Sequence, residues 1–432
     1  MGSIRVSSNG RFFVDHTGKP FFYLGDTAWL LFQRMNHEEV DEYLKDRADK
    51  GFTVIQAYVL RGLGSPHPDG QISLIGETPL IDRDPTRPNE AFFRNVDHII
   101  HRANDLGLVM GLVVAKSWHV NQHPERVFDA KNAYTFGKFL AERYRESSVL
   151  WYVGGDSVPG DDEAVWVAMA RGLRDGSGGS HLISYHGSGR TSSSTWFHEA
   201  DWLDFNSIQS GHGWAARTYD YVTHDYGLAP AKPTVDMEPP YENHPTGPNT
   251  PRIDSHQVRK GAYWAMLAGA AGHGYGALDL FRLYKENDGP FPRDGFQPWR
   301  TAITYEGSRQ VGLMRNLFEL RPWHRMIPDQ AVIATGQGEG EAHIQAARAE
   351  DGSFLIAYLP HGNPVGIDLE RISGSEVNAL WYDPRAGTWI PIGRYPNTGV
   401  REFAPPSSGE KDDWALVLED GQRNYPLDRR IG

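Results

Sequence analysis

The sequence predicts a (β/α)8 TIM barrel followed by a small all-β sandwich domain. Eight apolar runs alternate with helical patterns over about 300 residues, which matches such a barrel in strand number and length. From about residue 331, short strand patterns follow one another without helices, as in a β-sandwich. The 432 residues suffice for one large and one small domain. We therefore expect a barrel at 1–325 and a sandwich at 326–432.

A short hairpin is expected before the eight barrel strands. Asn9-Gly10 and Thr17-Gly-Lys-Pro20 are turn signals that predict a hairpin before the main domain. The apolar runs that follow are bounded by helical patterns and are short enough for strands. We expect the barrel strands at 21–25, 53–60, 108–115, 149–153, 181–185, 205–208, 233–235 and 274–280.

Helical patterns separate these strands. Asn36 is suited to cap a helix with Glu39 in the reciprocal position. Apolar stripes predict further helices near 92–103, 136–144, 165–169, 254–267 and 308–320. An open doubly wound sheet is the structural alternative, but it normally carries a glycine-rich phosphate turn after its first strand. Gly25-Asp-Thr-Ala-Trp29 is not such a turn.

The tail has a different pattern. Turn signals such as Glu350-Asp-Gly352 and Asp383-Pro-Arg-Ala-Gly387 separate short apolar runs. Regular short strands without helices predict packed antiparallel sheets. The expected strands are 332–334, 343–347, 354–358, 379–382 and 414–418.

Composition narrows the function. The net charge of −12 argues against nucleic acid, which needs a basic surface, and against an anionic membrane. The lack of cysteine removes disulfides, thiolate nucleophiles and cysteine-held metals. The 13 Trp, 19 Tyr and 19 Phe favour sugar binding, because flat rings stack on sugar faces. No apolar run of signal-peptide length is present, which predicts a cytoplasmic protein as sequenced, or a secreted or periplasmic one if a leader was removed.

Active residues of a barrel lie at the C-terminal ends of its strands. There, Asp156 follows an apolar run and two glycines, and Glu238 precedes two prolines. Two facing carboxylates suit glycoside hydrolysis, since one protonates the leaving oxygen while the other attacks the anomeric carbon or activates water. We predict these two residues as catalytic. The residues expected to bind substrate are Asp26, Trp29, Lys116, Trp118, His186, Gln209, His212 and Tyr241.

Other interpretations of these residues compete. Most Asp and Glu residues are surface or salt-bridged acids, and either carboxylate could be one. Ser192-Ser-Ser194 has no nucleophile elbow around it. A metal site could form if ligands from separate strands converge with Asp26, although no metal-binding motif is visible. The histidines available for it are His119, His123, His186, His198, His212 and His273. We predict that neither a metal nor a cofactor takes part.

Several motifs occur in a fixed order: Phe21-Phe-Tyr-Leu-Gly-Asp-Thr-Ala-Trp29, Leu150-Trp-Tyr-Val-Gly-Gly-Asp156, Trp202-Leu-Asp-Phe-Asn-Ser-Ile-Gln-Ser-Gly-His212, Glu238-Pro-Pro-Tyr-Glu242 and Ala262-Tyr-Trp-Ala-Met-Leu-Ala-Gly-Ala-Ala-Gly-His-Gly-Tyr-Gly276. Together they resemble the apiosidase-like catalytic domain of glycoside hydrolase family 140, over roughly residues 5–325. The tail, with Trp381-Tyr-Asp-Pro-Arg-Ala-Gly-Thr-Trp389, resembles the collagen-binding-type β-domain usually attached to that barrel.

The resemblance implies a retaining, exo-acting hydrolase that removes terminal β-D-apiofuranose, with a carbohydrate or glycoside as its partner. It also implies that Asp156 is the acid/base and Glu238 the nucleophile. In the wider clan of such barrels the acid/base is usually a Glu after Asn, whereas here an Asp follows two glycines. Two alternatives stay open: an arabinofuranosidase or galactofuranosidase on the same barrel, and a non-enzymatic carbohydrate- or matrix-binding protein.

Overall fold

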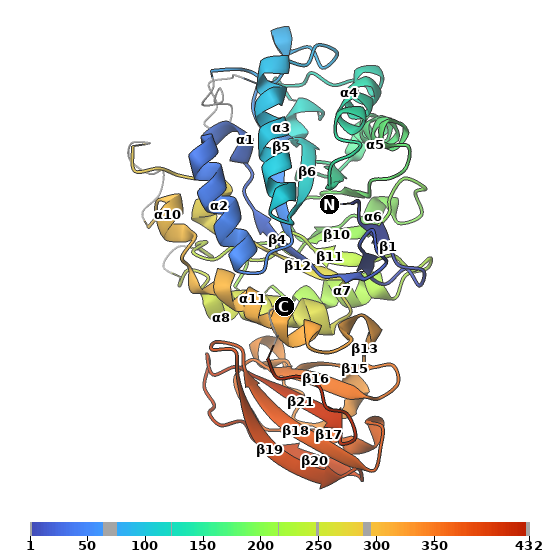
Figure 1. Cartoon of the computed structure of the whole chain (residues 1–432), viewed down its shortest axis with the longest axis vertical. Helices are drawn as coiled ribbons and strands as arrows, with labels where there is room; N and C mark the ends of the chain where they lie inside the picture. Colours follow the sequence, from blue (N-terminus) through green and yellow to red (C-terminus); the bar gives the residue numbers. More distant parts are fainter. Residues whose placement is uncertain are drawn as a thin grey trace.

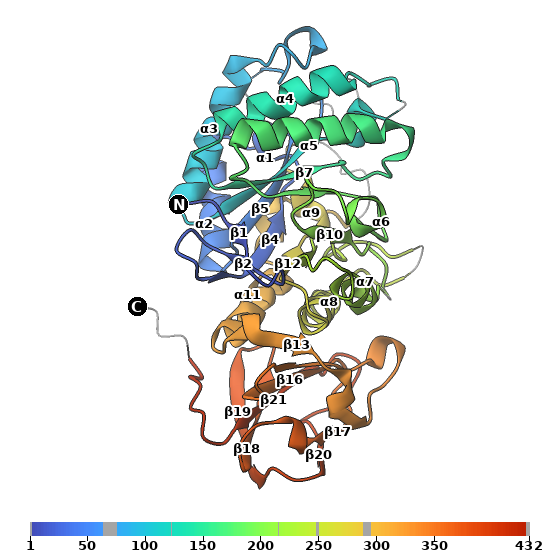
Figure 2. The same cartoon turned by 90° about the vertical axis from the view of Figure 1, so that its right-hand side faces the viewer.

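The structure is a computed structural model that describes residues 2–63, 76–121, 123–214, 216–247, 250–287 and 295–428. A barrel with helices around it lies above a β-domain (Figures 1 and 2). The barrel strands run parallel to one another in the order β8-β7-β6-β5-β4-β12-β11-β10. They are β4 (Tyr23–Thr27), β5 (Val54–Leu60), β6 (Val109–Ala115), β7 (Val149–Val153), β8 (Ile183–Tyr185), β10 (Asn206–Gln209), β11 (Thr234–Asp236) and β12 (Gly272–Tyr275).

Serine side chains close the barrel where no backbone ladder joins β8 to β10. The hydroxyl of Ser184 donates to the carbonyl of Phe205 at 2.7 Å, and that of Ser207 donates to the carbonyl of Tyr185 at 2.6 Å. A further short strand, β9 (Thr191–Ser192), pairs antiparallel with the outer edge of β10. The predicted (β/α)8 fold class is therefore confirmed.

Helices cover the outside of the barrel. The predicted capping box at Asn36 and Glu39 is present. None of the helices within the described ranges is long and apolar enough to cross a membrane. The helices are α1 (Leu31–Arg34), α2 (His37–Asp49), α3 (Glu90–Asp105), α4 (Ala130–Arg143), α5 (Glu163–Ser177), α6 (Ser194–Phe197), α7 (Thr218–Tyr226), α8 (Ser255–Leu267), α9 (Leu278–Phe281), α10 (Trp299–Ala302) and α11 (Glu306–Glu319).

The N-terminal segment packs against the N-terminal end of the barrel. It forms a three-stranded antiparallel sheet of β1 (Arg5–Val6), β2 (Phe13–Val14) and β3 (Pro20–Phe21) instead of the expected two-stranded hairpin. Phe13 contacts Phe205 edge-on, with 5.3 Å between the ring centroids. Because Phe205 immediately precedes β10, this contact places the small sheet opposite the end where a barrel carries its active site.

The C-terminal domain contains two antiparallel sheets around an apolar core. The first has the order β13-β15-β16-β21-β18-β19 and the second β14-β17-β20. The strands are β13 (Met326–Pro328), β14 (Ile333–Thr335), β15 (Gln345–Ala349), β16 (Phe354–Leu359), β17 (Val365–Asp368), β18 (Glu376–Asp383), β19 (Thr388–Pro396), β20 (Val400–Phe403) and β21 (Trp414–Asp420). Four of these, β13, β17, β19 and β20, were not expected from the sequence.

One predicted barrel strand is wrong in part. The run 274–280 was expected to be a single strand, but β12 ends at Tyr275 and α9 begins at Leu278. Gly276 lies between them, where an added Cβ would be 2.2 Å from the ring of Tyr241. A short apolar run does not distinguish a strand from a helix by periodicity, so the sequence did not show this break.

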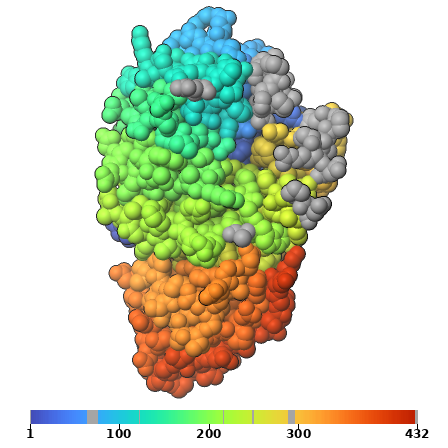
Figure 3. Space-filling view, turned by 180° about the vertical axis from the view of Figure 1, so that it is seen from behind, coloured from blue at the N-terminus to red at the C-terminus, as the bar shows by residue number. Residues whose placement is uncertain are grey.

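The two parts of the chain share a buried interface. In Figure 3 the C-terminal domain lies directly against the barrel, and one apolar cluster includes both barrel residues and Phe354, Ile356 and Val417. Tyr263 of α8 stacks on Tyr358 with 4.5 Å between centroids and 9° between planes. The expected domain division at 325 stays a prediction, since the apolar core continues across it.

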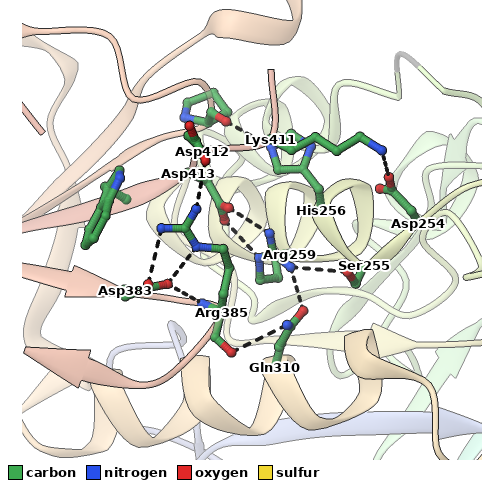
Figure 4. Close-up of polar contacts among 12 residues, drawn as sticks. Asp254, Ser255, His256, Arg259, Gln310, Asp383, Arg385, Lys411, Asp412 and Asp413 are labelled. Carbon is green, nitrogen blue, oxygen red and sulfur yellow. Dashed lines mark hydrogen bonds and ion pairs between the residues drawn. The ribbon is translucent and has the colours of Figure 1, made fainter. Parts of the chain in front are cut away.

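An ion pair is buried in this interface (Figure 4). Arg259 of α8 donates from Nε and Nη2 to the two carboxylate oxygens of Asp413, at 2.9 and 2.7 Å. Its Nη1 donates to Oε1 of Gln310, and the Tyr358 hydroxyl also donates to Asp413. Every charged group in this cluster therefore has partners, which a buried ion pair needs in order to offset its desolvation.

Replacing Arg259 by Ala is expected to destabilise the protein by about 3–5 kcal/mol, because Asp413 would remain buried without its cation. Chemical unfolding followed by fluorescence measures this loss. Lys45→Ala, which removes the exposed Lys45–Asp49 pair of α2, is the matched control and should cost only about 0.3–0.5 kcal/mol. Equal losses in the two variants would contradict a structural role for the interface.

Candidate active site

Asp156 and Glu238 line one pocket of about 290 Å³ at the C-terminal ends of the barrel strands. Asp156 lies in the loop after β7, and Glu238 in the loop after β11. The structure thus brings the two predicted carboxylates to a common site, while their catalytic roles stay predictions. The other residues around the pocket are Trp29, Tyr58, Arg61, His212, Tyr241, His244, Leu278, Phe281, Arg282 and Phe296.

Two histidines hold the buried carboxylate of Glu238. Its Oε2 lies 2.8 Å from Nε2 of His186, and its Oε1 lies 3.2 Å from Nε2 of His212. Burial would raise the pKa of Glu238, but the hydrogen bonds and positive charge of the two imidazoles outweigh burial and hold that pKa below its usual range. Glu238 therefore stays ionised at neutral pH, the state that a carboxylate nucleophile needs.

Two acids close to Glu238 in the sequence, Asp236 and Glu242, have raised instead of lowered pKa values. Burial raises the pKa of Asp236 to about 7, and hydrogen bonds from Ser210 only partly oppose this shift. Burial likewise raises the pKa of Glu242 to about 7, against a hydrogen bond from the Tyr275 hydroxyl. Neither acid lines the pocket. Among these three acids close in sequence, Glu238 alone combines a low pKa with access to the pocket.

The turn that carries Asp156 has a left-handed backbone. Gly154, Gly155 and Asp156 have φ angles of 104°, 65° and 65°. A Cβ on Gly155 would lie 2.1 Å from the carbonyl oxygen of Ala115, so only glycine allows this close approach to the end of β6. Left-handed non-glycine residues are uncommon and cluster at functional sites. The two glycines thus serve to bring Asp156 close to the segment that follows β6.

That segment supplies the partner of Asp156. Nζ of Lys116 lies 2.5 Å from Oδ2 of Asp156, and the two side chains are 9% and 39% exposed. Burial lowers the pKa of Lys116, and the charge of Asp156 opposes that shift. Trp118 lies beside this pair, with its ring centroid 5.5 Å from Nζ. The structure pairs Lys116 with Asp156, and the expectation that Lys116 holds a sugar hydroxyl stays a prediction.

Aromatic rings form one side of the pocket. The centroid of Trp29 lies 5.0 Å from that of Tyr58 and 5.5 Å from that of His186, at interplanar angles of 65° and 27°. Tyr241 lies 4.2 Å from His212 between centroids. Trp29, His212 and Tyr241, all expected to bind substrate, thus line the pocket, and His186 contacts it through Glu238.

Asp26 and Gln209 lie elsewhere. Asp26 is fully buried, where it accepts a hydrogen bond from the Tyr43 hydroxyl at 2.6 Å and lies 3.4 Å from Nη1 of Arg47. Its carboxylate is therefore occupied by structural partners, and its expected contact with substrate stays a prediction. Gln209 is 6% exposed and does not line the pocket.

Other pocket residues were not predicted as substrate contacts. Tyr58 lies near the end of β5, at a position that the strand-end rule selects, and Arg61 lies just after the strand, where the same rule could have added it. His244, Arg282 and Phe296 come from long loops after β11 and β12. No local pattern in the sequence distinguishes such loop residues, because their position depends on the fold of the whole barrel end.

A nucleophile-like glutamate and a second carboxylate in one pocket of a (β/α)8 barrel are the groups that glycoside hydrolysis requires. A solved structure described as "Glycoside hydrolase" is similar to this chain, with 32% identity, a TM-score of 0.91 and 98% of each chain covered. A glycoside hydrolase family 5 protein from Bacteroides vulgatus ATCC 8482 has 33% identity and a TM-score of 0.91, covering 98% of this chain and 95% of its own. The protein is a glycoside hydrolase.

Its family follows from the matched residues. Residues 7–325 match the model "Apiosidase-like, catalytic domain", so the chain belongs to the apiosidase-like family. Residues 327–419 match "Putative collagen-binding domain of a collagenase". No curated protein matches the chain. The resemblance seen in the motifs is thus confirmed for both parts.

Proposed function

We propose that the protein is a retaining, exo-acting glycosidase that releases terminal β-D-apiofuranose from a plant-derived glycoside or a pectic side chain. The observation that carries this proposal is the ionised Glu238, held by two histidines in the same pocket as Asp156. Membership of the apiosidase-like family supports the choice of sugar.

The size of the pocket supports removal of one terminal sugar. Ligand pockets for larger molecules usually span about 300–1,000 Å³. At about 290 Å³, this pocket lies just below that range and suits a single furanose ring. An enzyme that cleaved inside a polymer would instead need an open groove through the catalytic centre.

The reaction proceeds in two displacements. A carboxylate oxygen of Glu238 attacks the anomeric carbon while the bond to the leaving oxygen breaks, and that oxygen takes a proton from Asp156. The resulting glycosyl ester on Glu238 is then attacked by water, which gives a proton to Asp156 as the ester bond breaks. Two inversions at one carbon give net retention, and both carboxyl groups return to their starting states.

Lys116 suits the second role of its partner. In the second step its ammonium, with Nζ 2.5 Å from Oδ2 of Asp156, stabilises the carboxylate form that accepts a proton from water.

A panel of 4-nitrophenyl furanosides tests the proposal. The expected result is a kcat/KM for the β-D-apiofuranoside that exceeds those for arabino- and galactofuranosides by at least about tenfold, the ratio that one good polar contact gives. Proton NMR during early turnover should show the β-anomer as first product. A preferred arabinofuranoside or galactofuranoside would replace the sugar assignment, and an initial α-anomer would contradict retention.

Hydrolysis is expected to need no metal, because two carboxylates suffice for this mechanism. Among the described residues, no three His, Asp or Glu side chains are arranged to hold a metal ion. Dialysis against a strong chelator should leave kcat unchanged. A rate that is lost and then restored by a divalent cation, at unchanged melting temperature, would instead support the histidine-based metal interpretation.

A further inference from the structure

A second cavity, of about 560 Å³, lies on the same end of the barrel as the catalytic pocket. Its walls come from the loops after β8, β10 and β11 and from the start of α7. Its lining includes Arg190, Ser210, Trp214, Arg217, Tyr221 and Thr246. Of these, only Ser210, which donates to Asp236, was described above.

The two cavities are neighbours. His212, which lines the catalytic pocket, lies in the chain between Ser210 and Gly213 of the second cavity. His244, also in the catalytic pocket, precedes Thr246 by two residues. The rings of His212 and His244 are packed together, with 4.7 Å between centroids. The chain segments that carry these two histidines therefore line both cavities.

The second cavity has the chemistry of a saccharide site. Half-buried Trp214 and Tyr221 provide aromatic faces for sugar rings. Arg217 pairs with Asp220 at 2.7 Å, and this exposed pair offers both donors and acceptors. The exposed guanidinium of Arg190, in the loop after β8, adds hydrogen-bond donors for hydroxyl groups. Aromatic faces beside a few polar groups are typical of such pockets.

Trp214 also reaches a third cavity. This smaller space, of about 180 Å³, lies where the barrel meets the C-terminal domain. Trp214 is shared with the second cavity, and the other lining residues are His256, Gln257, Glu341, His361, Glu410 and Lys411. The second and third cavities therefore share Trp214, and the third extends the surface toward the C-terminal domain.

The catalytic pocket has room for the sugar that is cleaved, so its leaving group must extend outside it. We propose that the second cavity binds the saccharide that leaves, with Trp214 as its stacking platform. This inference rests on the proposed function, and it adds that the natural leaving group is itself a saccharide rather than a small alcohol.

The variants Trp214→Ala and Trp214→Phe test this site on two substrates. One is 4-nitrophenyl β-D-apiofuranoside, and the other is an apiofuranoside whose leaving group is a disaccharide. Trp214→Ala should lower kcat/KM for the disaccharide apioside about tenfold, mainly through KM, because it removes one stacked aromatic contact. For the nitrophenyl substrate, Trp214→Ala should change kcat/KM less than twofold. Trp214→Phe keeps an aromatic face, so its kcat/KM should fall less than about threefold on either substrate.

Melting temperatures of all variants show whether a loss reflects folding. The proposal is overturned if kcat/KM of Trp214→Ala falls equally on both substrates at unchanged melting temperature, or if it falls on neither substrate. A calorimetric titration with the free disaccharide separates this inference from the proposed function, because it needs no hydrolysis. Binding by the wild type that weakens about tenfold in Trp214→Ala supports the site even if no apiofuranoside is cleaved. The absence of wild-type binding overturns it.

Discussion

In Glu238→Gln, the rate of hydrolysis is expected to fall by roughly 10⁴-fold or more for every glycoside that the wild type cleaves. Removal of a catalytic nucleophile typically has an effect of this size. The amide preserves the shape of the side chain between His186 and His212, but it cannot form the glycosyl ester. Steady-state rates on aryl and saccharide substrates measure the loss, which should not depend on the leaving group.

Glu242→Gln is the matched control. This neighbouring acid is buried, accepts a hydrogen bond from the Tyr275 hydroxyl at 2.7 Å and lies outside the pocket. Its removal should cost less than about tenfold in kcat. In Glu238→Ala, added azide can attack only from the vacated face, so it should yield the inverted glycosyl azide. A retained azide product from this variant would assign the nucleophile to another residue.

The barrel could be predicted from the sequence because its signals are local. Asn36 and Glu39 form a capping box within one turn, and β5 and β6 are buried along their whole length and apolar apart from Gln56. Once the strands were placed, the strand-end rule gave a short set of positions, and the chemistry of paired carboxylates together with the family motifs selected Asp156 and Glu238 from that set. Neither step required knowledge of contacts between distant residues.

The remaining features depend on such distant contacts. β19 is mostly exposed along its length, so it has no apolar pattern to reveal it. Asp26 stands at a strand end like Asp156 and Glu238, but Tyr43 and Arg47 of α2 bind it from outside the pocket. The pairing of Lys116 with Asp156 depends on the close approach of Gly155 to β6. Sequence spacing gives none of these partners.

Asp156→Ala is expected to separate the two steps of the reaction. On a natural apioside the first step should slow by about 10²–10⁴-fold, the usual contribution of acid catalysis. A nitrophenyl leaving group needs little protonation, so its first step should survive and hydrolysis of the glycosyl-enzyme should become limiting. A burst of nitrophenol followed by a slow steady rate would show this directly.

Azide then identifies the residue as the acid/base. Azide needs no deprotonation, so it should accelerate Asp156→Ala on the nitrophenyl substrate and give a glycosyl azide of retained β configuration. Asp161→Ala, which changes an exposed acid in the short 3-10 helix that follows Asp156 (Gly160–Asp162), should show neither the burst nor the acceleration. The assignment fails if azide gives the inverted product with Asp156→Ala, because the covalent intermediate would then be absent. It also fails if Asp156→Ala cleaves the natural apioside within about tenfold of the wild-type rate, well below the range of acid catalysis.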